Sequence, residues 1–583
     1  MGSPLVRVAF AVLVAATIGA FFVTQQLKGE FPLVLRFAAT PNSISPNRDG
    51  VRDDTIVGFD LSERAKVSLF VVDSEGREVR RLVDDKELAG DTKHRYVWNG
   101  RADDGQRVRD GKYHLRVVRR DEGRVINSIK TIRVDTKRPK LRLASARPSV
   151  IAPGNPGQDP LVRIRYRGPR NGEPEFRIFR TDEGPPRVVA RFRGNDRREA
   201  LWHGSIRGRP AVDGDYTFTV TVRDRAGNRS VAPAEVPTAR LAGSGTGVAV
   251  RHLTLRGPVT PVRAGSLARL DVGPYRHSFE FALSRLGGSR AIRSDRRSGG
   301  RFRVRIPARA RTGLYFVRVR AGDRRAVWPL AVQGRGGRGA RPLVVLPVIS
   351  WQGLNPVDDD LDGFADTLQD SRAVPLARPF ARGAAPRALT AETAPLLRFL
   401  DRAHLSYDLT TDVSLGAAGL GDRSGVVLAG SARWLTPGLQ RELRRYVEGG
   451  GRVASFGGDA LRRSVQLRAG RLRDPTAAAR ENALGERTRL VRQRAAPLTV
   501  QEDRLGIFAG AGLAGDFSLF DLSTGGRRRL SAAGPEGDRP AFVAYRLDKG
   551  LVVRSGTPQW AGGLSDAGVA AATERIWSLL RRR

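Results

Sequence analysis

The sharpest chemical pattern in this sequence is an acidic loop near the middle of the chain. Carboxylates stand at loop positions 1, 3, 5 and 9: Asp358, Asp360, Asp362 and Asp366. Gly363 at position 6 permits a tight turn, and the backbone carbonyl of Phe364 at position 7 offers a further oxygen. Oxygen ligands in this order surround one hard cation, so the sequence predicts a calcium site. The alternatives are a solvated acidic turn and a catalytic carboxylate cluster.

The acidic loop departs from a complete EF-hand loop at position 12, where Gln369 replaces the bidentate glutamate. It therefore looks like the shorter calcium loops of extracellular repeat proteins, which work at about millimolar calcium. A weaker version of the pattern, in which Ser45 replaces the first carboxylate, is interpreted either as a calcium loop or as an ordinary Asx turn. Its members are Asn47, Asp49, Gly50 and Asp53.

Few residues of this chain could act as a nucleophile or as its base, because the chain contains no Cys and 6 His. Disulfides, thiolate metal sites and a cysteine nucleophile are therefore excluded. Ser431 follows a predicted strand, but it lacks the second glycine of the G-x-S-x-G motif. His404, upstream on a predicted helix, is the one histidine of the last 240 residues, so the domain offers no second histidine with which to build a triad at Ser431.

The charge balance is strongly basic: 101 Lys and Arg against 60 Asp and Glu give a net charge of +41. Basic clusters at 293–305, 527–529 and 581–583 could attract polyanions. The alternative is a GC-rich coding sequence, which raises Arg, Ala and Gly together. No nucleic-acid-binding signature is present, so the predicted partners are an anionic cell-envelope polymer or lipid headgroups rather than nucleic acid.

The amino terminus carries a charge-free apolar run over residues 8–23, between Arg7 and Lys28. This length is at the short end of a membrane span and overlaps that of a signal-peptide core. Cleavage after Ala20 would place Ile18 where a small residue is required. The sequence therefore predicts an uncleaved anchor at 1–30, and hence a single-pass cell-membrane protein with its bulk extracytoplasmic. A cleaved signal is the alternative.

A repeat with a period near 100 residues organises the next part of the chain. Glycine-x-tyrosine elements open alternating apolar runs at Gly111, Gly214 and Gly313, spaced by 214 − 111 = 103 and 313 − 214 = 99 residues. Such alternation is typical of half-buried strands, and modules of about 100 residues built from them are typical of β-sandwiches. We predict three all-β Ig-like sandwiches, with Gly-rich linkers at 242–247 and 334–341. Their ranges are 31–137, 138–240 and 246–333.

The first sandwich resembles a known module. Its stretch SPNRDGVRDDT, from Ser45 to Thr55, followed by a W-x-G element at Trp98, resembles the Ig-like module of the flagellar hook-capping protein. The second sandwich shares the W-x-G element at Trp202, and the third shares only the strand pattern. The resemblance implies an Ig-like fold in which the Trp and Tyr side chains belong to the core, and it carries over no binding residue.

Residues 340–583 change to strands alternating with helices. The apolar run 342–348 predicts a strand buried on both faces, and helices are expected near 390–404 and after Thr436, which precedes Pro437. A second and a third strand are expected at 426–428 and 453–456, and the pattern favours an α/β domain with a mostly parallel sheet. The fold class is therefore multidomain: an N-terminal transmembrane helix, three β-sandwiches and a C-terminal α/β domain.

The run from Leu435 to Asp459 resembles the class I glutamine-amidotransferase-like fold, in particular the C-terminal part of the N,N-dimethylformamidase beta (large) subunit family. The amidotransferase resemblance implies a cysteine nucleophile on the turn after the strand, but Gly457, Gly458 and Asp459 stand there. The dimethylformamidase resemblance implies iron held by Tyr and Glu, and no residue matches those ligands one by one. We therefore expect a cell-envelope binding or structural protein with a degenerate amidotransferase-like domain. The alternative is a metal-dependent amide hydrolase.

Overall fold

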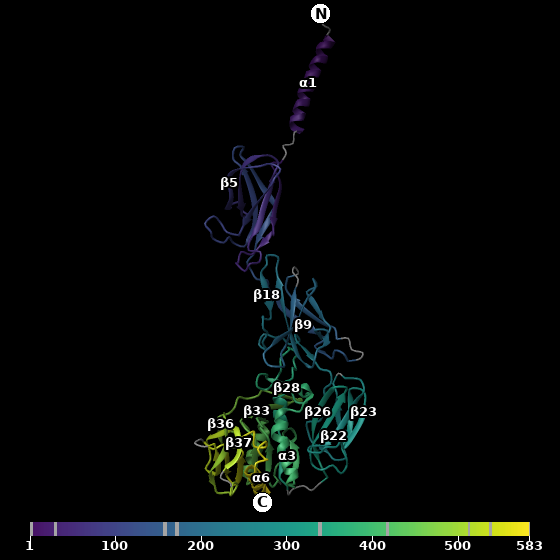
Figure 1. Ribbon diagram of the computed structural model, residues 1–583, viewed down its shortest axis with the longest axis vertical. Helices are drawn as coiled ribbons and strands as arrows, with labels where there is room; N and C mark the ends of the chain where they lie inside the picture. Colours follow the sequence, from purple (N-terminus) through teal and green to yellow (C-terminus); the bar gives the residue numbers. More distant parts are fainter. Residues whose placement is uncertain are drawn as a thin grey trace.

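The computed structural model describes residues 4–27, 32–155, 160–169, 174–273, 275–335, 341–415, 419–421, 423–510, 513–535 and 539–581. Most of the predicted linker at 334–341 lies outside these residues. The chain is elongated: helix α1 (Pro4–Leu27) stands at one end, and two β-sandwiches follow it in line. At the other end a third sandwich lies beside the C-terminal unit (Figure 1).

Helix α1 corrects the prediction at the amino terminus. Among the helices of the described residues, none combines the length and the hydropathy that crossing a bilayer requires. The predicted transmembrane helix and the single-pass cell-membrane location were therefore wrong. The charge-free run 8–23 is shorter than the roughly 20 residues of a typical span, and Ala, Thr and Gly dilute its centre.

The first sandwich pairs a three-stranded sheet with a five-stranded sheet. The smaller sheet has the order β1 (Val34–Thr40), β3 (Thr55–Leu61), β6 (Lys93–Trp98). The larger sheet has the order β2 (Ser43–Ile44), β8 (Arg124–Val134), β7 (Gly111–Arg119), β4 (Ala65–Val72), β5 (Glu78–Leu88). Alternate residues of these strands form one buried core, in which the rings of Trp98 and Tyr113 meet edge to face with centroids 5.3 Å apart.

The second sandwich has the same two-layer plan. Its smaller sheet has the order β14 (Glu199–Trp202), β11 (Val162–Arg167), β9 (Arg142–Arg147). The larger has the order β10 (Val150–Ile151), β19 (Val248–Val250), β17 (Gly214–Arg223), β12 (Glu175–Arg180), β13 (Arg187–Arg193), with β18 (Arg229–Ala232) on β17. Strands β15 (Ser205–Ile206) and β16 (Arg209–Pro210) form a small hairpin. Strand β19 follows the Gly-rich stretch 242–247, so this stretch leads back into the second sandwich.

The third sandwich is smaller. One sheet has the order β20 (Val262–Arg263), β26 (Arg324–Gln333), β25 (Gly313–Ala321), β22 (Phe279–Arg285), β23 (Arg293–Arg297). The other pairs β21 (Leu267–Asp271) with β24 (Arg301–Arg305).

The repeated tyrosines have one shared structural role. In each copy the buried hydroxyl donates to the backbone carbonyl four residues upstream: Tyr113 to Arg109 at 2.6 Å, Tyr216 to Val212 at 3.0 Å, and Tyr315 to Arg311 at 2.9 Å. This is the tyrosine corner of Ig-like sandwiches. The prediction that these aromatic residues belong to the core is confirmed.

The C-terminal unit is built on a nine-stranded sheet. Its parallel part has the order β29 (Asp408–Thr411), β27 (Leu343–Leu346), β30 (Val426–Ala429), β32 (Arg452–Phe456), β40 (Gly550–Arg554). Four antiparallel strands continue it: β39 (Phe542–Leu547), β38 (Arg529–Gly534), β36 (Arg487–Asp503) and β37 (Leu513–Gly525).

This sheet corrects the predicted fold class. The unit is a mixed β-sheet rather than a mostly parallel α/β fold, and the chain as a whole is mostly β-structure, with 44% strand and 13% helix. The sequence pattern predicted no strand between 457 and 550. Strands from that stretch add to the sheet through antiparallel pairing, which requires no crossover helix.

Helices cover both faces of the parallel part. Helices α3 (Ala394–Arg402) and α6 (Ala567–Arg581) pack on one face with Val344 and Leu346, and α5 (Pro437–Glu448) packs on the other with Leu343 and Val345. The predicted burial of this strand on both faces is therefore confirmed. The α3 face continues into the third sandwich, so the two share one hydrophobic core.

Short elements close the carboxyl edge of the parallel strands. The helical ones are α2 (Val348–Gly353), α4 (Asp412–Leu415), η1 (Ala381–Gly383) and η2 (Leu389–Thr393). The strands are β28 (Ala373–Pro375), β35 (Arg471–Arg473) and β34 (Gln466–Arg468) in one small sheet, and β31 (Trp434–Leu435) with β33 (Arg463–Ser464) in another.

Candidate metal centre in the acidic loop

The acidic loop leaves the C-terminal unit after α2 and returns to it before β28. The Asp366 N–H donates to the Val357 carbonyl at 2.8 Å and closes the loop at its base. Two positive φ angles, 60° at Leu361 and 93° at Gly363, give the tight turn that the glycine at position 6 predicted.

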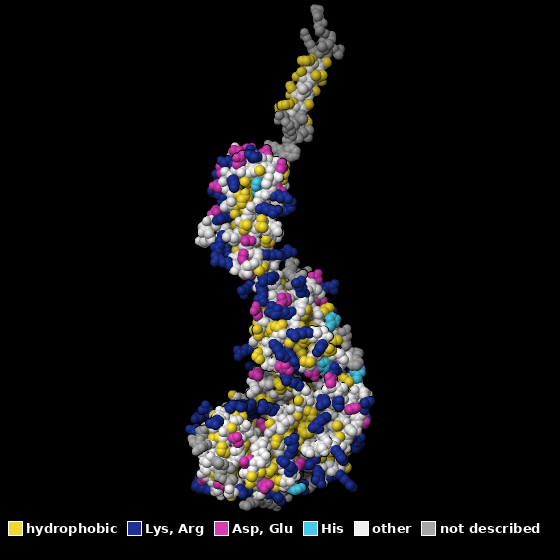
Figure 2. Space-filling model, viewed as in Figure 1, with side chains coloured by type: hydrophobic (Ala, Val, Ile, Leu, Met, Phe, Trp, Pro, Cys, Tyr) yellow, Lys and Arg dark blue, Asp and Glu magenta, His cyan; other side chains and the backbone are white. Residues whose placement is uncertain are grey.

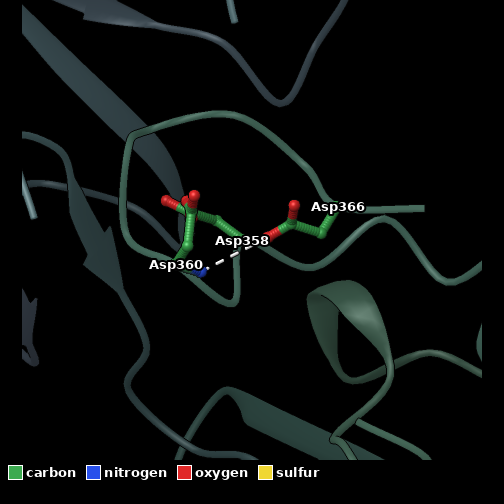
Figure 3. Close-up of side chains that lie close together, drawn as sticks. All are labelled: Asp358, Asp360 and Asp366. Atoms are coloured by element: carbon green, nitrogen blue, oxygen red, sulfur yellow. Dashed lines mark hydrogen bonds between the residues drawn. The ribbon is translucent and has the colours of Figure 1, made fainter. Parts of the chain in front are cut away.

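Three of the predicted ligands come together in this loop. Asp358, Asp360 and Asp366 each offer one carboxylate oxygen, and these oxygens all lie within 4.8 Å of one another (Figure 3). Backbone N–H groups orient them: Gly363 donates to Asp358 at 2.8 Å, and Asp359 donates to Asp366 at 2.8 Å. These bonds leave further lone pairs free on each carboxylate, as a cation site requires.

The other two predicted ligands lie differently. Asp362 is not part of the group of three, and its carboxylate accepts the Phe364 N–H at 2.7 Å. Phe364 contacts the loop through this N–H, whereas the prediction assigned its backbone carbonyl as a ligand of the cation.

The carboxylates of this loop are poorly compensated. Burial, together with the neighbouring carboxylates, raises the pKa of Asp358 to about 8 and that of Asp362 to about 7. Asp359 pairs with the buried Arg378. Within the described residues, no Lys or Arg reaches ion-pair distance of the four predicted ligand carboxylates, although the chain has a net charge of +41.

The acidic loop packs against the second sandwich. The Gly245 N–H and the Ser244 hydroxyl donate to the Asp360 carbonyl at 3.2 and 2.9 Å, and the Gly247 N–H donates to the Leu361 carbonyl at 2.8 Å. The Gly-rich stretch 242–247 has no regular element, as predicted, but the acidic loop accepts its hydrogen bonds.

A second contact comes from the strands of that sandwich. The Thr181 hydroxyl donates to the Gly363 carbonyl. A Cβ atom on Gly363 would lie 2.6 Å from Cβ of Thr217, so only glycine fits at this position. The Thr217 hydroxyl is buried and has no hydrogen-bond partner among the described residues.

Asp215 extends the acidic environment from the second sandwich. It is 2% exposed, it pairs with Arg251, and its charge adds to the rise in the pKa of Asp358. Sequence reasoning missed Thr181, Asp215 and Arg251, because nothing in the local pattern links them to a loop more than 100 residues away.

The turn that carries the nucleophile in amidotransferases holds an ion cluster here. Asp459 has a positive φ of 50°, and its carboxylate faces Arg433 at 3.7 Å and Arg462 at 3.6 Å. The Ser431 hydroxyl accepts the Gly458 N–H at 3.0 Å. Salt bridges occupy the Asp459 carboxylate, and the geometry therefore indicates a structural role for this turn.

Packed side chains occupy part of the space beyond the carboxyl ends of β27 and β30, where open α/β sheets usually bind ligands. They form an apolar cluster of Ile349, Leu368, Val374, Leu376, Trp434, Val465 and Leu472. Beside this cluster a hollow of about 480 Å³ remains, lined by Ser350 and Trp351 of α2 and by Arg251 of the second sandwich.

The iron that the dimethylformamidase resemblance implies does not fit the tyrosines of the C-terminal unit. Each hydroxyl already donates elsewhere: Tyr407 to Asp401 at 3.2 Å, Tyr446 to the Arg423 carbonyl at 2.9 Å, and Tyr545 to the Leu484 carbonyl at 3.2 Å. Burial raises the pKa of all three, which opposes the deprotonation that a metal-bound tyrosine needs.

Comparisons with known families agree with the predicted order of modules. Residues 45–123 match the FlgD Ig-like domain, and residues 299–502 match the family "N,N-dimethylformamidase beta subunit-like, C-terminal". The second match begins inside the third sandwich, ahead of the predicted start at 340. This start is consistent with the core that the third sandwich shares with the C-terminal unit.

No curated protein matched the chain. Among solved structures, the I-band fragment I67–I69 of titin and its E-to-A mutated variant each share 10% identity over 50% of this chain and 95% of theirs. Their TM-scores are 0.20 and 0.19.

Proposed function

We propose that this chain, with its FlgD Ig-like domain and its dimethylformamidase-like C-terminal match, is a cell-envelope binding or structural protein whose acidic loop binds calcium. The observation that carries the proposal is the position of the loop. Three carboxylates with no cationic partner among the described residues converge at the joint between the second sandwich and the C-terminal unit.

Calcium would have a structural role here. Asp358, Asp360 and Asp366 would hold it, and it would supply the positive charge that these carboxylates lack. The same loop accepts hydrogen bonds from the second sandwich through the carbonyls of Asp360 and Leu361. Ordering the loop would therefore fix the C-terminal unit against the second sandwich, and it would leave the first two sandwiches as a spacer.

Binding or structural work is favoured over amide hydrolysis. The chain has no cysteine and arginines engage the Asp459 carboxylate, which argues against a nucleophile at the amidotransferase turn. The hydroxyls of Tyr407, Tyr446 and Tyr545 donate elsewhere, which argues against the iron of a metal-dependent hydrolase. We infer that the amidotransferase-like part has become a scaffold.

The test is elemental analysis of the purified full chain, before and after chelation, together with its thermal unfolding. The proposal expects about one equivalent of calcium, removed by chelator together with several degrees of Tm and restored on re-addition. Stoichiometric iron or zinc would contradict it and favour the hydrolase, and binding of no metal would reduce the loop to a solvated turn.

A further inference from the structure

A hollow of about 730 Å³ opens between the third sandwich and the C-terminal unit, away from the acidic loop. Among the described residues, five arginines line it: Arg285, Arg309, Arg311, Arg335 and Arg341. They come from the end of β22, the loop before β25, the segment after β26 and the segment before β27. We call this hollow the arginine groove.

The groove holds uncompensated positive charge. Its acidic residue, Asp401, is engaged by Arg285 at 2.8 Å and by the Tyr407 hydroxyl at 3.2 Å. The remaining four arginines have no ion-pair partner in the described part of the chain. Pairing Arg285 with Asp401 leaves a net charge of four positive units in one concave space.

Concavity together with a shortage of acidic residues distinguishes these arginines: a second hollow, lined by Arg296, Arg318, Arg320 and Arg325, also contains Glu280 and Asp295. Figure 2 shows Lys and Arg side chains scattered over the whole visible face of the protein, so charge alone marks no site. A cleft lined by one sign of charge concentrates the field and raises the local concentration of counter-ions. The basic runs at 293–305 and 527–529 do not line the arginine groove.

We infer that the arginine groove binds a compact, multiply charged phosphate group. Guanidinium groups pair with phosphate through parallel charge-assisted hydrogen bonds, and the five donors of arginine fit that geometry better than the point charge of lysine. Phosphate groups also place several negative charges in a small volume, which four unbalanced arginines in one groove require. A carboxylate polymer supplies one charge for each much larger sugar unit.

The inference is independent of the calcium proposal, because no residue of the acidic loop lines the groove. It also assigns a location to the anionic partner that the net charge of the chain suggested. The groove opens beside the C-terminal end of α3, where the exposed His404 adds a further polar group to its wall.

Isothermal titration of the full chain with tripolyphosphate, in calcium-free buffer, tests the inference. We expect saturable binding that weakens as salt rises, and a loss of affinity of about tenfold or more in the double variant Arg309→Gln/Arg311→Gln. Both side chains are exposed, so the variant should keep its thermal unfolding temperature. The matched control is Arg441→Gln/Arg445→Gln on α5, at the opposite face of the sheet, which removes the same charge and should bind within about twofold of the unmodified chain.

The inference fails if tripolyphosphate does not bind at low salt, or if both double variants lose affinity equally, since the effect would then belong to the overall charge. Tighter binding of polygalacturonate than of tripolyphosphate would overturn the assignment to phosphate. A synthetic poly(glycerol phosphate) identifies the source: its binding supports a phosphate polymer as the ligand, and binding of tripolyphosphate alone supports a free oligophosphate.

Discussion

The substitution Asp360→Asn should reverse its effect on stability according to whether calcium is present. In the metal-free protein, three carboxylate oxygens lie within 4.8 Å of one another. At that separation two unit charges repel by about 1 kcal/mol in water and by about 3.5 kcal/mol at an effective dielectric constant of about 20. Asp360 is exposed, so the lower figure applies, and we expect the metal-free variant to be more stable by about 1 kcal/mol.

With calcium the order should invert. At a calcium concentration of about 100 times Kd, binding stabilises the folded protein by about 2.7 kcal/mol. Ligand charge sets calcium affinity, so loss of one of three close carboxylates should weaken the site by about 100-fold. The gain from calcium would then fall to about 0.4 kcal/mol, and a shift in Tm of about 5–10 °C would fall to about 1–2 °C.

The assay is thermal unfolding of both proteins in chelator and in calcium, followed by circular dichroism. Asparagine can keep the one hydrogen bond that the Asp360 carboxylate accepts, from the Asp362 N–H at 3.1 Å, so the comparison isolates charge. The control is Asp370→Asn, an exposed neighbour outside the group of three, which should behave like the unmodified chain. Equal calcium shifts in all three proteins would refute the site.

Three further outcomes are expected. In chelator, the free energy of unfolding should fall as pH rises from about 4 to about 8. The pKa of Asp358 in the folded state is about 8, above its usual 3.8, so the folded state binds an extra proton in that window. Calcium should flatten this dependence, which urea unfolding at a series of pH values would measure. Gly363→Ala brings a Cβ within 2.6 Å of the Thr217 Cβ at a φ of 93°, and it should lower the free energy of unfolding by about 1–3 kcal/mol. It should also raise protease sensitivity around 242–247, and unchanged proteolysis would contradict the packing of the acidic loop against the second sandwich. Arg554→Met breaks a pair of 2.8 Å bonds to the buried Glu486 and should lower the free energy of unfolding of the C-terminal unit by about 3–5 kcal/mol in urea titrations.

Local patterns predicted most of the sandwich elements. Alternation after Gly111, Gly214 and Gly313 identified strands, because the side-chain period of two is set by the backbone itself. The Thr436 cap predicted the start of α5, and its hydroxyl accepts the Leu439 N–H at 3.3 Å.

Nonlocal pairing caused the main errors. Strands β36 and β37 join the sheet by long antiparallel pairing. Most of β36 is exposed or half-buried, so its sequence carries no clean apolar run. The predicted anchor rested on the absence of charge over 8–23, whereas crossing a bilayer depends on summed length and hydropathy. Absence of charge was therefore an insufficient signal.

The sequence by itself determined what neighbouring residues decide: the strand period, the helix cap and the spacing of the acidic loop, in which Asp358, Asp360 and Asp366 share one turn. Only the tertiary structure decided what surrounds that loop, since Thr181 and Asp215 reach it from another sandwich. The arginine groove is the clearest case. Its arginines stand singly or in pairs along the chain, and they become one charged surface only because the third sandwich packs against the C-terminal sheet and shares its core.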